Sequence, residues 1–192
     1  MEIIIVDDKS TDSSWSIIQN FKRDHRDLKV LTYQLPKRCG TAWAQNIAYY
    51  YAQGEYIMNM DSDDIIEPRK VEAQLEFMKA NELDACGTNF TIFDTNPRIP
   101  LKEDGGYWLE YDSEKIKEKY DKHIHCTCFG TMMFNHRVIE TCGGMNKQYI
   151  GTEDYHMMKR VSDLGFRIGN IPDQLYHYRY HTGQRSKLFH AK

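Results

Sequence analysis

The sequence predicts an α/β protein whose sheet is mostly parallel. In the first half of the chain, short apolar segments rich in β-branched residues alternate with longer segments whose apolar residues recur at helical spacing. The first of these segments, at residues 2–6, is also apolar on both faces, which is typical of a strand buried within a parallel sheet. Right-handed crossovers between parallel strands would place helices on both faces of such a sheet.

Each element follows from its own pattern, beginning at the N-terminus. Residues 2–6 form a β-branched strand that stops at Asp7 and Asp8, and N-cap residue types then begin a helix that extends to about residue 26. Small residues four apart mark a closely packed helix over 41–53, with Gly54 expected at its C-terminal end. The other expected strands of this half are residues 29–33, 55–60 and 84–94, and a further helix begins near Pro68.

The second half carries weaker patterns. Residues 95–111 are polar and contain two prolines and a Gly-Gly pair, so we expect a long loop that is functional or mobile. Apolar spacing predicts a helix over 153–164, and strict alternation predicts an extended segment over 176–181. The other expected elements are helices at 113–122 and 137–142 and strands at 130–134 and 167–171. At 192 residues the chain has the length of one domain, 1–192.

Composition excludes several classes of protein. Lys and Arg number 25 against 28 Asp and Glu, so the formal net charge is −3 and we expect no nucleic-acid partner. No apolar run approaches the roughly 20 residues of a membrane span, and the N-terminus lacks a leader pattern. We therefore expect a cytoplasmic protein. A peripheral membrane or protein partner and the oligomeric state stay open.

The five cysteines are expected to be reduced thiols, because their number is odd and their spacing is irregular. The alternative is a zinc site formed by His123, His125, Cys126 and Cys128. No second ligand pair stands at a standard zinc-finger spacing, so structural cysteines are the favoured interpretation.

Acidic residues directly follow two of the predicted strands. Asp7 and Asp8 end the first strand, and Asp61, Asp63 and Asp64 follow the third. Ligands of open α/β sheets bind at the carboxyl ends of the strands, so two such clusters indicate a site at that edge. Neighbouring carboxylates repel one another unless a cation is present, and oxygen ligands suit Mg²⁺ or Mn²⁺, which would bind a phosphate. The alternative is two solvated turns, where Asp is common.

A further carboxylate comes from the predicted helix at 153–164. Asp154 stands at helical spacing from three apolar residues, Met157, Met158 and Val161. We therefore expect Asp154 to point inward, and Glu153, rotated by roughly 100°, to point away. Free N–H groups at the first turn favour an ionised carboxylate, which would be an acceptor at the rim of a cleft. The alternative is a simple helix cap.

The C-terminal tail alternates tyrosine with basic residues. If residues 176–181 are extended, the three tyrosines line one face, and His177, Arg179 and His181 line the other. The second face would be cationic or metal-binding and would complement a diphosphate beside an acidic metal site. The alternative is a surface strand with packed tyrosines and solvated basic groups. The loop before the helix at 41–53 offers two further cations, Lys37 and Arg38.

Taken in order, these segments resemble the family 2 glycosyltransferases, inverting enzymes of the GT-A fold that use nucleotide-sugar donors. The run IIIVDDKSTD at 3–12 resembles the family's strand with paired Asp and the helix start after it. The run GTAWAQN at 40–46, with GEYI at 54–57, resembles the helix and strand that lead to the metal motif. The run DSDD at 61–64 is similar to the family's metal motif, and GTED at 151–154 is similar to its acceptor-side Glu-Asp motif. Residues 178–183 are similar to its closing Arg/His segment.

The resemblance implies roles for individual residues. Asp154 would be the catalytic base, and Glu153 would lie beside it on the acceptor side. Asp8 would hydrogen-bond the nucleotide base, and Asp61 would contact the ribose. The donor-binding residues would be Asp7, Asp8, Lys37, Arg38, Asn46, Asp61 and Arg179. The ligands of Mn²⁺ or Mg²⁺ would be Asp63, Asp64 and His181.

The expected function is transfer of a sugar from a nucleotide-diphosphate donor, a uridine diphosphate sugar, to a hydroxyl of a glycan or other acceptor, with inversion. Residues 1–94 would be the nucleotide-binding half and 95–192 the acceptor-binding half. Family members usually carry one more strand and helix before the paired-Asp strand, so the resemblance implies an N-terminally shortened fold. The alternatives are a non-catalytic or truncated sugar-nucleotide-binding protein and a receiver-like signalling domain.

Overall fold

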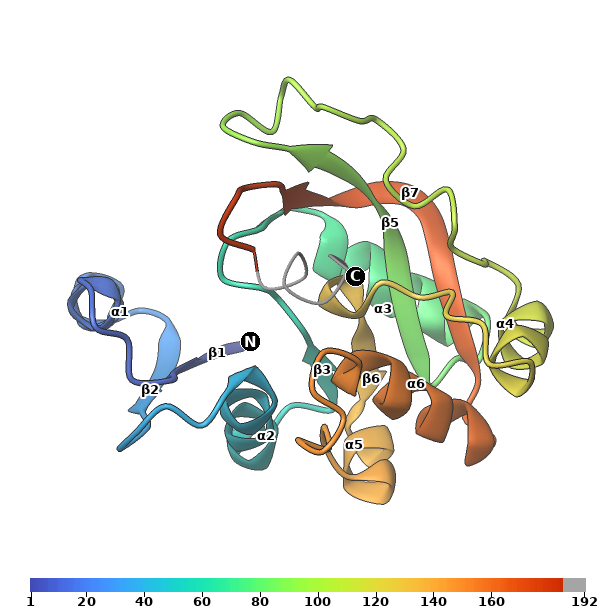
Figure 1. Cartoon of the computed structure of the whole chain (residues 1–192), viewed down its shortest axis with the longest axis horizontal. Helices are drawn as coiled ribbons and strands as arrows, with labels where there is room; N and C mark the ends of the chain where they lie inside the picture. The colour runs from blue at the N-terminus through green and yellow to red at the C-terminus, as the bar shows by residue number, and fades with distance from the viewer. Residues whose placement is uncertain (185–192) are drawn as a thin grey trace.

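In the computed structural model, which describes residues 1–184, two sheets combine with helices (Figure 1). β1 (Glu2–Asp7) and β2 (Lys29–Gln34) form a parallel pair. The second sheet has five strands in the order β3-β6-β5-β7-β4. They are β3 (Tyr56–Met58), β4 (Ile65–Ile66), β5 (Ala85–Phe93), β6 (Met133–Asn135) and β7 (Ile168–Arg179). The remainder of the expected domain, 185–192, lies outside the described residues.

The α/β fold class is confirmed, but the five-stranded sheet is mixed rather than mostly parallel. Only the β5–β7 pair is parallel, whereas β3–β6, β5–β6 and β4–β7 are antiparallel. The prediction was wrong because it assumed that the alternation of strand and helix seen in residues 1–94 sets the direction of every strand. The sheet also contains β6 and β7, which come from the second half of the chain. β6 is reached from the short helix η1 (Phe129–Thr131), and antiparallel neighbours need no helical crossover. The two-residue β4 was not predicted at all.

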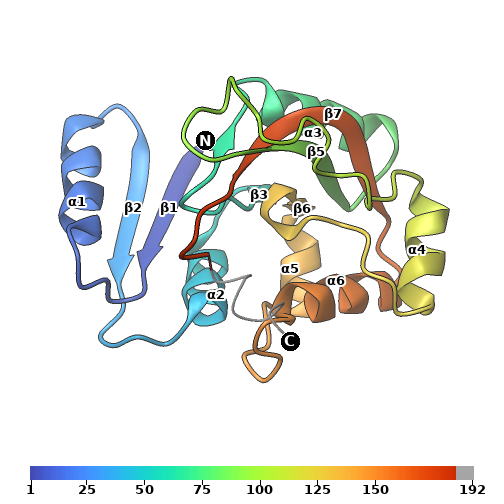
Figure 2. The same cartoon turned by 45° about the horizontal axis from the view of Figure 1, so that its top comes forward.

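Helices cover both faces of the five-stranded sheet (Figure 2). α3 (Lys70–Ala80) packs on one face, and α4 (Ser113–Asp121), α5 (His136–Cys142) and α6 (Glu153–Asp163) pack on the other. Side chains that follow one another along a strand enter opposite layers, as the pleat requires. Ala85 joins the core beneath α4, α5 and α6, and Cys86, the next residue, joins the core beneath α3.

The helix ends follow local chemistry, with one correction. α1 (Ser14–Asp24) and α2 (Thr41–Tyr51) lie where apolar and small-residue spacing predicts them. α2 is capped by Ala52, so Gly54 lies two residues beyond the cap and the expected role of this glycine is wrong. Gly143 has that role for α5, where a φ of 69° suits a residue without Cβ.

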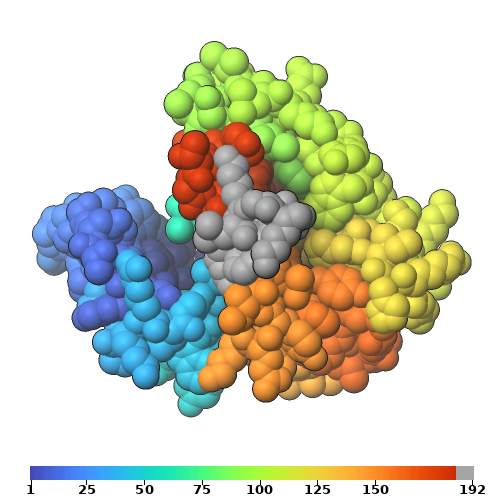
Figure 3. Space-filling model, viewed as in Figure 1, coloured from blue at the N-terminus to red at the C-terminus, as the bar shows by residue number. Residues whose placement is uncertain are grey.

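The N-terminal strands form a lobe beside the larger sheet. Within residues 1–184, β1 hydrogen-bonds to β2 and to no strand of the five-stranded sheet. α2 packs on β1 and reaches the larger core through buried Tyr49. Figure 3 shows this lobe in blue, with a hollow between it and the rest of the molecule.

β7 connects the two halves of the chain. The segments predicted separately at 167–171 and 176–181 join in this one strand of 12 residues, which bends where its register with β5 shifts at Thr88 to Phe90. β7 also pairs with β4, directly after the acidic run at 61–64. The strand therefore carries the tyrosine and basic residues of the tail to the acidic cluster.

Candidate active site

The second acidic cluster is built around a tyrosine hydroxyl. Asp64 is 7% exposed, and its Oδ2 accepts a hydrogen bond of 2.6 Å from the hydroxyl of Tyr176 on β7. Its Oδ1 accepts a second bond of 2.7 Å from the backbone N–H of Arg179. The Tyr176 oxygen in turn accepts from the backbone N–H of Asp61 at 3.3 Å. Asp64 thus fixes the cluster to β7.

Ionisation of this cluster is unfavourable. Burial raises the pKa of Asp61 to about 7, and the charges of Asp64, Asp63 and Asp154 add to that effect. Asp61 keeps access to solvent, but one side of its carboxylate is closed by the backbone of Gly130, where a Cβ would come within 2.8 Å of Oδ2. Burial also raises the pKa of Asp64 to about 6, although the bonds from Tyr176 and Arg179 oppose this. A bound cation would relieve this repulsion.

Two basic residues of the tail curl back onto the cluster. Arg179 donates from Nε to the carbonyl of Asp63 at 2.6 Å and from Nη1 to the carbonyl of Asp94 at 2.9 Å. His181 places Nε2 3.0 Å from Oδ2 of Asp63. The structure therefore brings together Asp61, Asp63, Asp64, Arg179 and His181.

The prediction that the basic face as a whole meets the acidic cluster is wrong for His177. Its Nδ1 lies 2.7 Å from the hydroxyl of Thr91, and its Nε2 lies 2.7 Å from a carboxylate oxygen of Glu67. Tyr176, on the opposite face of the strand, contacts Asp64 instead. The strand ends at Arg179, so the predicted alternation holds over 176–179 and not over 180–181. Which of these side chains reach the cluster is set by the pairing of β7 with β4 and β5.

The described residues offer a partial set of ligands for a divalent cation. Among the residues that the structure describes, no three His, Cys, Asp or Glu side chains converge on one point. Asp63 and His181 offer one pair, and both oxygens of Asp64 already accept hydrogen bonds. Mg²⁺ is commonly held by one or two carboxylates together with substrate phosphates and water. The raised pKa of Asp61 adds an electrostatic preference for a cation.

The first acidic pair has a different environment. Asp7 is 5% exposed and accepts hydrogen bonds from the side chains of Ser10 and Gln34 and from the backbone of Ser10. Burial alone would raise the pKa of Asp7, but these bonds hold it below its usual value. Asp8 accepts from the backbone N–H groups of Cys39 at 2.6 Å and Gly40 at 2.9 Å. This pair thus holds the loop that enters α2.

The remaining predicted donor residues lie around that loop and α2. Lys37 and Arg38 are exposed, and Arg38 reaches the hydroxyl of Thr11 at 3.4 Å. The amide of Asn46 makes two bonds to the backbone of Met145, donating at 2.8 Å and accepting at 2.7 Å. Asn46 therefore ties α2 to the segment between α5 and α6.

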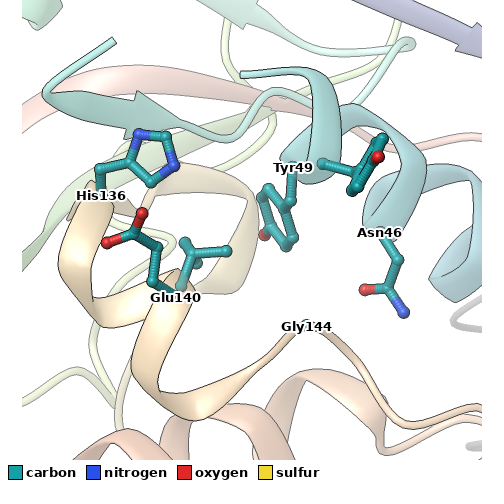
Figure 4. Close-up of a pocket in the computed structure, with 7 residues that line it drawn as sticks. Asn46, Tyr49, His136, Glu140 and Gly144 are labelled. Carbon is teal, nitrogen blue, oxygen red and sulfur yellow. The ribbon is translucent and has the colours of Figure 1, made fainter. Parts of the chain in front are cut away.

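Asn46 also lines a cavity of about 330 Å³ between α2 and α5 (Figure 4). Tyr49 comes from α2, and His136 and Glu140 come from α5. None of the five clustered residues lines this cavity, so it is separate from the acidic cluster. We locate the chemistry at the cluster, where carboxylates and cationic groups converge.

The acceptor-side pair is oriented opposite to the prediction. Glu153 is 7% exposed and accepts from the backbone N–H of Gly151 at 2.7 Å, whereas the Asp154 side chain is 43% exposed. Glu153 therefore shares the buried face with Met157 and Val161, because its carboxylate closes the turn before α6. The charge of Asp154 makes a minor contribution to the raised pKa of Asp61. Its Oδ2 lies 4.0 Å from Nε2 of His125.

Sequence reasoning missed three residues of this site. Tyr176 was assigned to the face away from the ligand, although its place in a strictly alternating segment was the available signal. Gly130 was read as the start of a strand, and no local pattern shows that it packs against Asp61 and Tyr176. His125 was weighed only as a zinc ligand, and its approach to Asp154 joins residues distant in the chain.

The α/β sheet, with an acidic cluster after one strand and basic groups from another strand beside it, has the arrangement expected of the GT-A fold. The comparisons agree: the model of the family "Glycosyl transferase family 2" matches residues 1–143. The chain therefore belongs to this family of glycosyltransferases. Family membership overturns the receiver-domain alternative.

Among relatives, the chain is 30% identical over 166 residues to a chondroitin synthase of Pasteurella multocida, covering 86% of this chain and 16% of that protein. It is 28% identical over 195 residues to the Escherichia coli UDP-Glc:alpha-D-GlcNAc-diphosphoundecaprenol beta-1,3-glucosyltransferase WfaP, covering 97% and 68%. The chain thus spans less than a quarter of the synthase and about two thirds of WfaP.

Two solved structures show the same fold. Residues 1–349 of Staphylococcus aureus TarS, in complex with UDP-GlcNAc, superpose with a TM-score of 0.75 at 19% identity, covering 97% of this chain and 51% of that one. The mannosyltransferase PcManGT from Pyrobaculum calidifontis, in complex with GDP-Man and Mn²⁺, has a TM-score of 0.66 at 21% identity, covering 95% and 48%. The GT-A type of the predicted fold is confirmed.

Across residues 1–184, no helix combines the length and the apolar character that a membrane crossing requires.

Proposed function

We propose that the chain transfers a sugar from a uridine diphosphate sugar to a hydroxyl of a glycan or other acceptor, with inversion at the anomeric carbon. The observation that carries this proposal is the convergence of Arg179 and His181 on Asp63 directly after β3, in a chain that belongs to a glycosyltransferase family. WfaP is named as a UDP-Glc-dependent glucosyltransferase, and TarS was solved with UDP-GlcNAc, which supports a uridine diphosphate donor.

Asp154 would act as the general base. Its carboxylate takes the proton of the acceptor hydroxyl as that oxygen bonds to the anomeric carbon. The bond from this carbon to the diphosphate oxygen breaks, and the nucleoside diphosphate leaves with the electron pair. Attack from the side opposite the leaving group inverts the configuration. Glu153, buried and bonded to Gly151, would hold the start of α6 and so aim Asp154.

The chain's cationic groups would stabilise the leaving diphosphate. Arg179 is held by two backbone carbonyls, so its guanidinium is oriented before the donor binds. Asp63, Asp64 and His181 would hold Mn²⁺ or Mg²⁺, which would neutralise charge on the diphosphate when bound. Asp64 would contribute mainly by fixing the position of the 61–64 loop, because both of its carboxylate oxygens already accept hydrogen bonds.

The nucleoside would lie toward the N-terminal lobe. Asp7 and Asp8 hold the turn and the loop at the end of β1, so we propose that they shape the wall against which the base binds. Asp61 would contact the ribose. Three further residues complete the proposed donor side. They are the two loop cations Lys37 and Arg38, and Asn46 of α2. Residues 1–94 would thus bind the nucleotide and 95–192 the acceptor.

We also place the protein in the cytoplasm. All five cysteines lie within the described residues, and all are free thiols. Reduced thiols are typical of proteins that work inside the cell.

Calorimetric titration of UDP, with Mn²⁺ and then with chelator, tests the donor site. We expect Mn²⁺-dependent binding that is lost in Asp63→Asn, which removes a ligand charge without changing shape. Asp27→Asn, at an exposed turn position, is the matched control and should bind as wild type does. If Asp63→Asn binds UDP with the wild-type affinity, the 61–64 cluster is not part of the donor site.

The catalytic assignment is tested separately on Asp154→Asn. Loss of a positioned general base typically costs about 10²- to 10⁴-fold in rate. We expect transfer from UDP-sugar to fall by that factor while UDP affinity stays at the wild-type value. Unchanged transfer would exclude Asp154 as the base.

A non-catalytic donor-binding protein is the second candidate. The observation in its favour is that β1 and β2 share no strand pairing with the five-stranded sheet within the described part of the chain. A lobe held mainly through α2 could bind the nucleotide without closing on the acceptor. UDP binding without hydrolysis or transfer from any UDP-sugar would favour this candidate.

A further inference from the structure

An aromatic cluster that the proposed chemistry does not use lies beside Asp154. Trp108 comes from the long loop after β5, His125 from the segment after α4, and Tyr155 from α6. The rings of Trp108 and His125 stack with centroids 5.5 Å apart at 29°, and the rings of His125 and Tyr155 meet edge to face at 5.7 Å and 79°. All three side chains are half-buried, so each keeps surface that a ligand can cover.

His125 is fixed within this cluster. The hydroxyl of buried Tyr120 lies 3.3 Å from Nδ1 of His125 and 2.6 Å from the hydroxyl of Thr127. On the other side of the ring, Nε2 lies 4.0 Å from Oδ2 of Asp154. This separation exceeds a direct hydrogen bond, but an oxygen at about 2.8 Å from both atoms fits between them.

The cluster also contacts the donor end of the site. Trp108 packs against the apolar group that contains Tyr176 and Phe90. The hydroxyl of Tyr176 bonds Asp64, so one packed group separates the indole from the acidic cluster. Burial lowers the pKa of His125, although the charge of Asp154 opposes this, so the neutral ring is favoured.

We propose that Trp108, His125 and Tyr155 form the acceptor subsite and that the acceptor is a glycan, whose sugar ring packs on these aromatic rings while its reacting hydroxyl lies between His125 and Asp154. This inference rests on the proposed function and narrows its acceptor to a sugar. Aromatic side chains bind amphipathic partners through a large apolar area at little entropic cost. A ring of His125 with its proton on Nε2 accepts from Tyr120 at Nδ1 and donates to the acceptor oxygen, whose own proton passes to Asp154.

Nuclear magnetic resonance of the tryptophan indoles tests this directly. The chain has three tryptophans, so Trp15→Phe and Trp43→Phe assign the signal of Trp108. The methyl β-glycosides of glucose, galactose and N-acetylglucosamine are titrated at millimolar concentration into protein with UDP and Mn²⁺. We expect at least one glycoside to shift the Trp108 signal saturably and to leave that of Trp43 unmoved. No shift by any glycoside, or an equal shift by glycerol, overturns the proposal.

Variants separate a binding role from a structural one. Trp108→Ala should weaken binding of the responding glycoside by about tenfold or more, measured by calorimetry, and leave UDP affinity unchanged. Tyr107→Ala, at an exposed position on the same loop, should change neither. An equal loss of glycoside and UDP binding in Trp108→Ala would make the cluster structural and overturn the subsite. Failure of wild-type protein to bind UDP would refute the donor site instead, and the glycoside result would stand by itself.

Discussion

The two acidic clusters look alike in sequence and differ in their electrostatics. Asp7 and Asp8 receive hydrogen bonds from nearby backbone and side chains, and the pKa of Asp7 lies below its usual value. At the other strand end, burial and mutual repulsion raise the pKa of Asp61 to about 7. The difference shows that the balance among burial, hydrogen-bond donors and neighbouring charges sets the pKa of each carboxylate, so two acidic clusters that look alike in sequence can differ in electrostatics.

The largest effect that would test this comparison is expected at the first cluster. Asp8→Asn replaces a carboxylate that accepts two backbone bonds with an amide whose NH₂ group faces one of those donors. We expect the free energy of unfolding to fall by about 2–3 kcal/mol, measured in urea. Asp27→Asn should stay close to wild type. If Asp8→Asn is as stable as wild type, the first cluster does not hold the loop.

A smaller loss of stability is expected where the second cluster is most crowded. A Cβ added at Gly130 would lie 2.8 Å from Oδ2 of Asp61 and 2.9 Å from the hydroxyl of Tyr176. Gly130→Ala should therefore cost about 1–3 kcal/mol and weaken Mn²⁺-dependent UDP binding. Gly183→Ala, where the added Cβ makes only ordinary contacts at 3.5 Å, is the control. Wild-type behaviour of Gly130→Ala would show that the cluster tolerates displacement of Asp61.

Tyr176→Phe removes the hydroxyl that links Asp64 to Asp61. The buried carboxylate of Asp64 then loses a donor, and unfolding should become easier by about 1–2 kcal/mol. Tyr107→Phe, which changes an exposed hydroxyl, should be neutral. Urea unfolding measures both variants, and equal stability would mean that Asp64 is held by the Arg179 N–H alone.

The smallest effect is a pH dependence of opposite sign at the two clusters. The raised pKa values, about 7 for Asp61 and about 6 for Asp64, mean that these groups bind protons more tightly in the folded than in the unfolded chain. Their contribution to stability is therefore complete below the unfolded pKa and is lost as the pH rises through 6 to 7. Asp7 has a lowered pKa, so its contribution to stability is present above the unfolded pKa. That contribution is lost as the pH falls through the folded pKa of Asp7.

Urea midpoints of metal-free protein at about pH 5.5 and about pH 7.5 measure this effect. We expect a lower midpoint at the higher pH, and Asp61→Asn should reduce the difference. A higher midpoint at the higher pH would contradict the charge repulsion assigned to the second cluster.

The sequence by itself determined much of the first half. Alternating apolar and helical patterns predicted β1, α1, β2, α2 and β3 and the acidic residues at two strand ends, because these are local properties of backbone and side-chain spacing. The acidic run at 61–64 also identified carboxylates that the fold brings together. The position of Asp154 in the first turn of α6 was likewise local.

Tertiary structure decided the rest. The insertion of β6 between β3 and β5 and the pairing of β7 with β4 set which face of the tail meets the cluster, so Tyr176 and not His177 reaches Asp64. The burial of Glu153 in place of Asp154 depends on the turn at Gly151. The approach of Trp108, His125 and Tyr155 joins three segments that no spacing rule connects. Strand pairing and side-chain contact between distant segments carry no local signature, and the proposed acceptor subsite is built entirely from them.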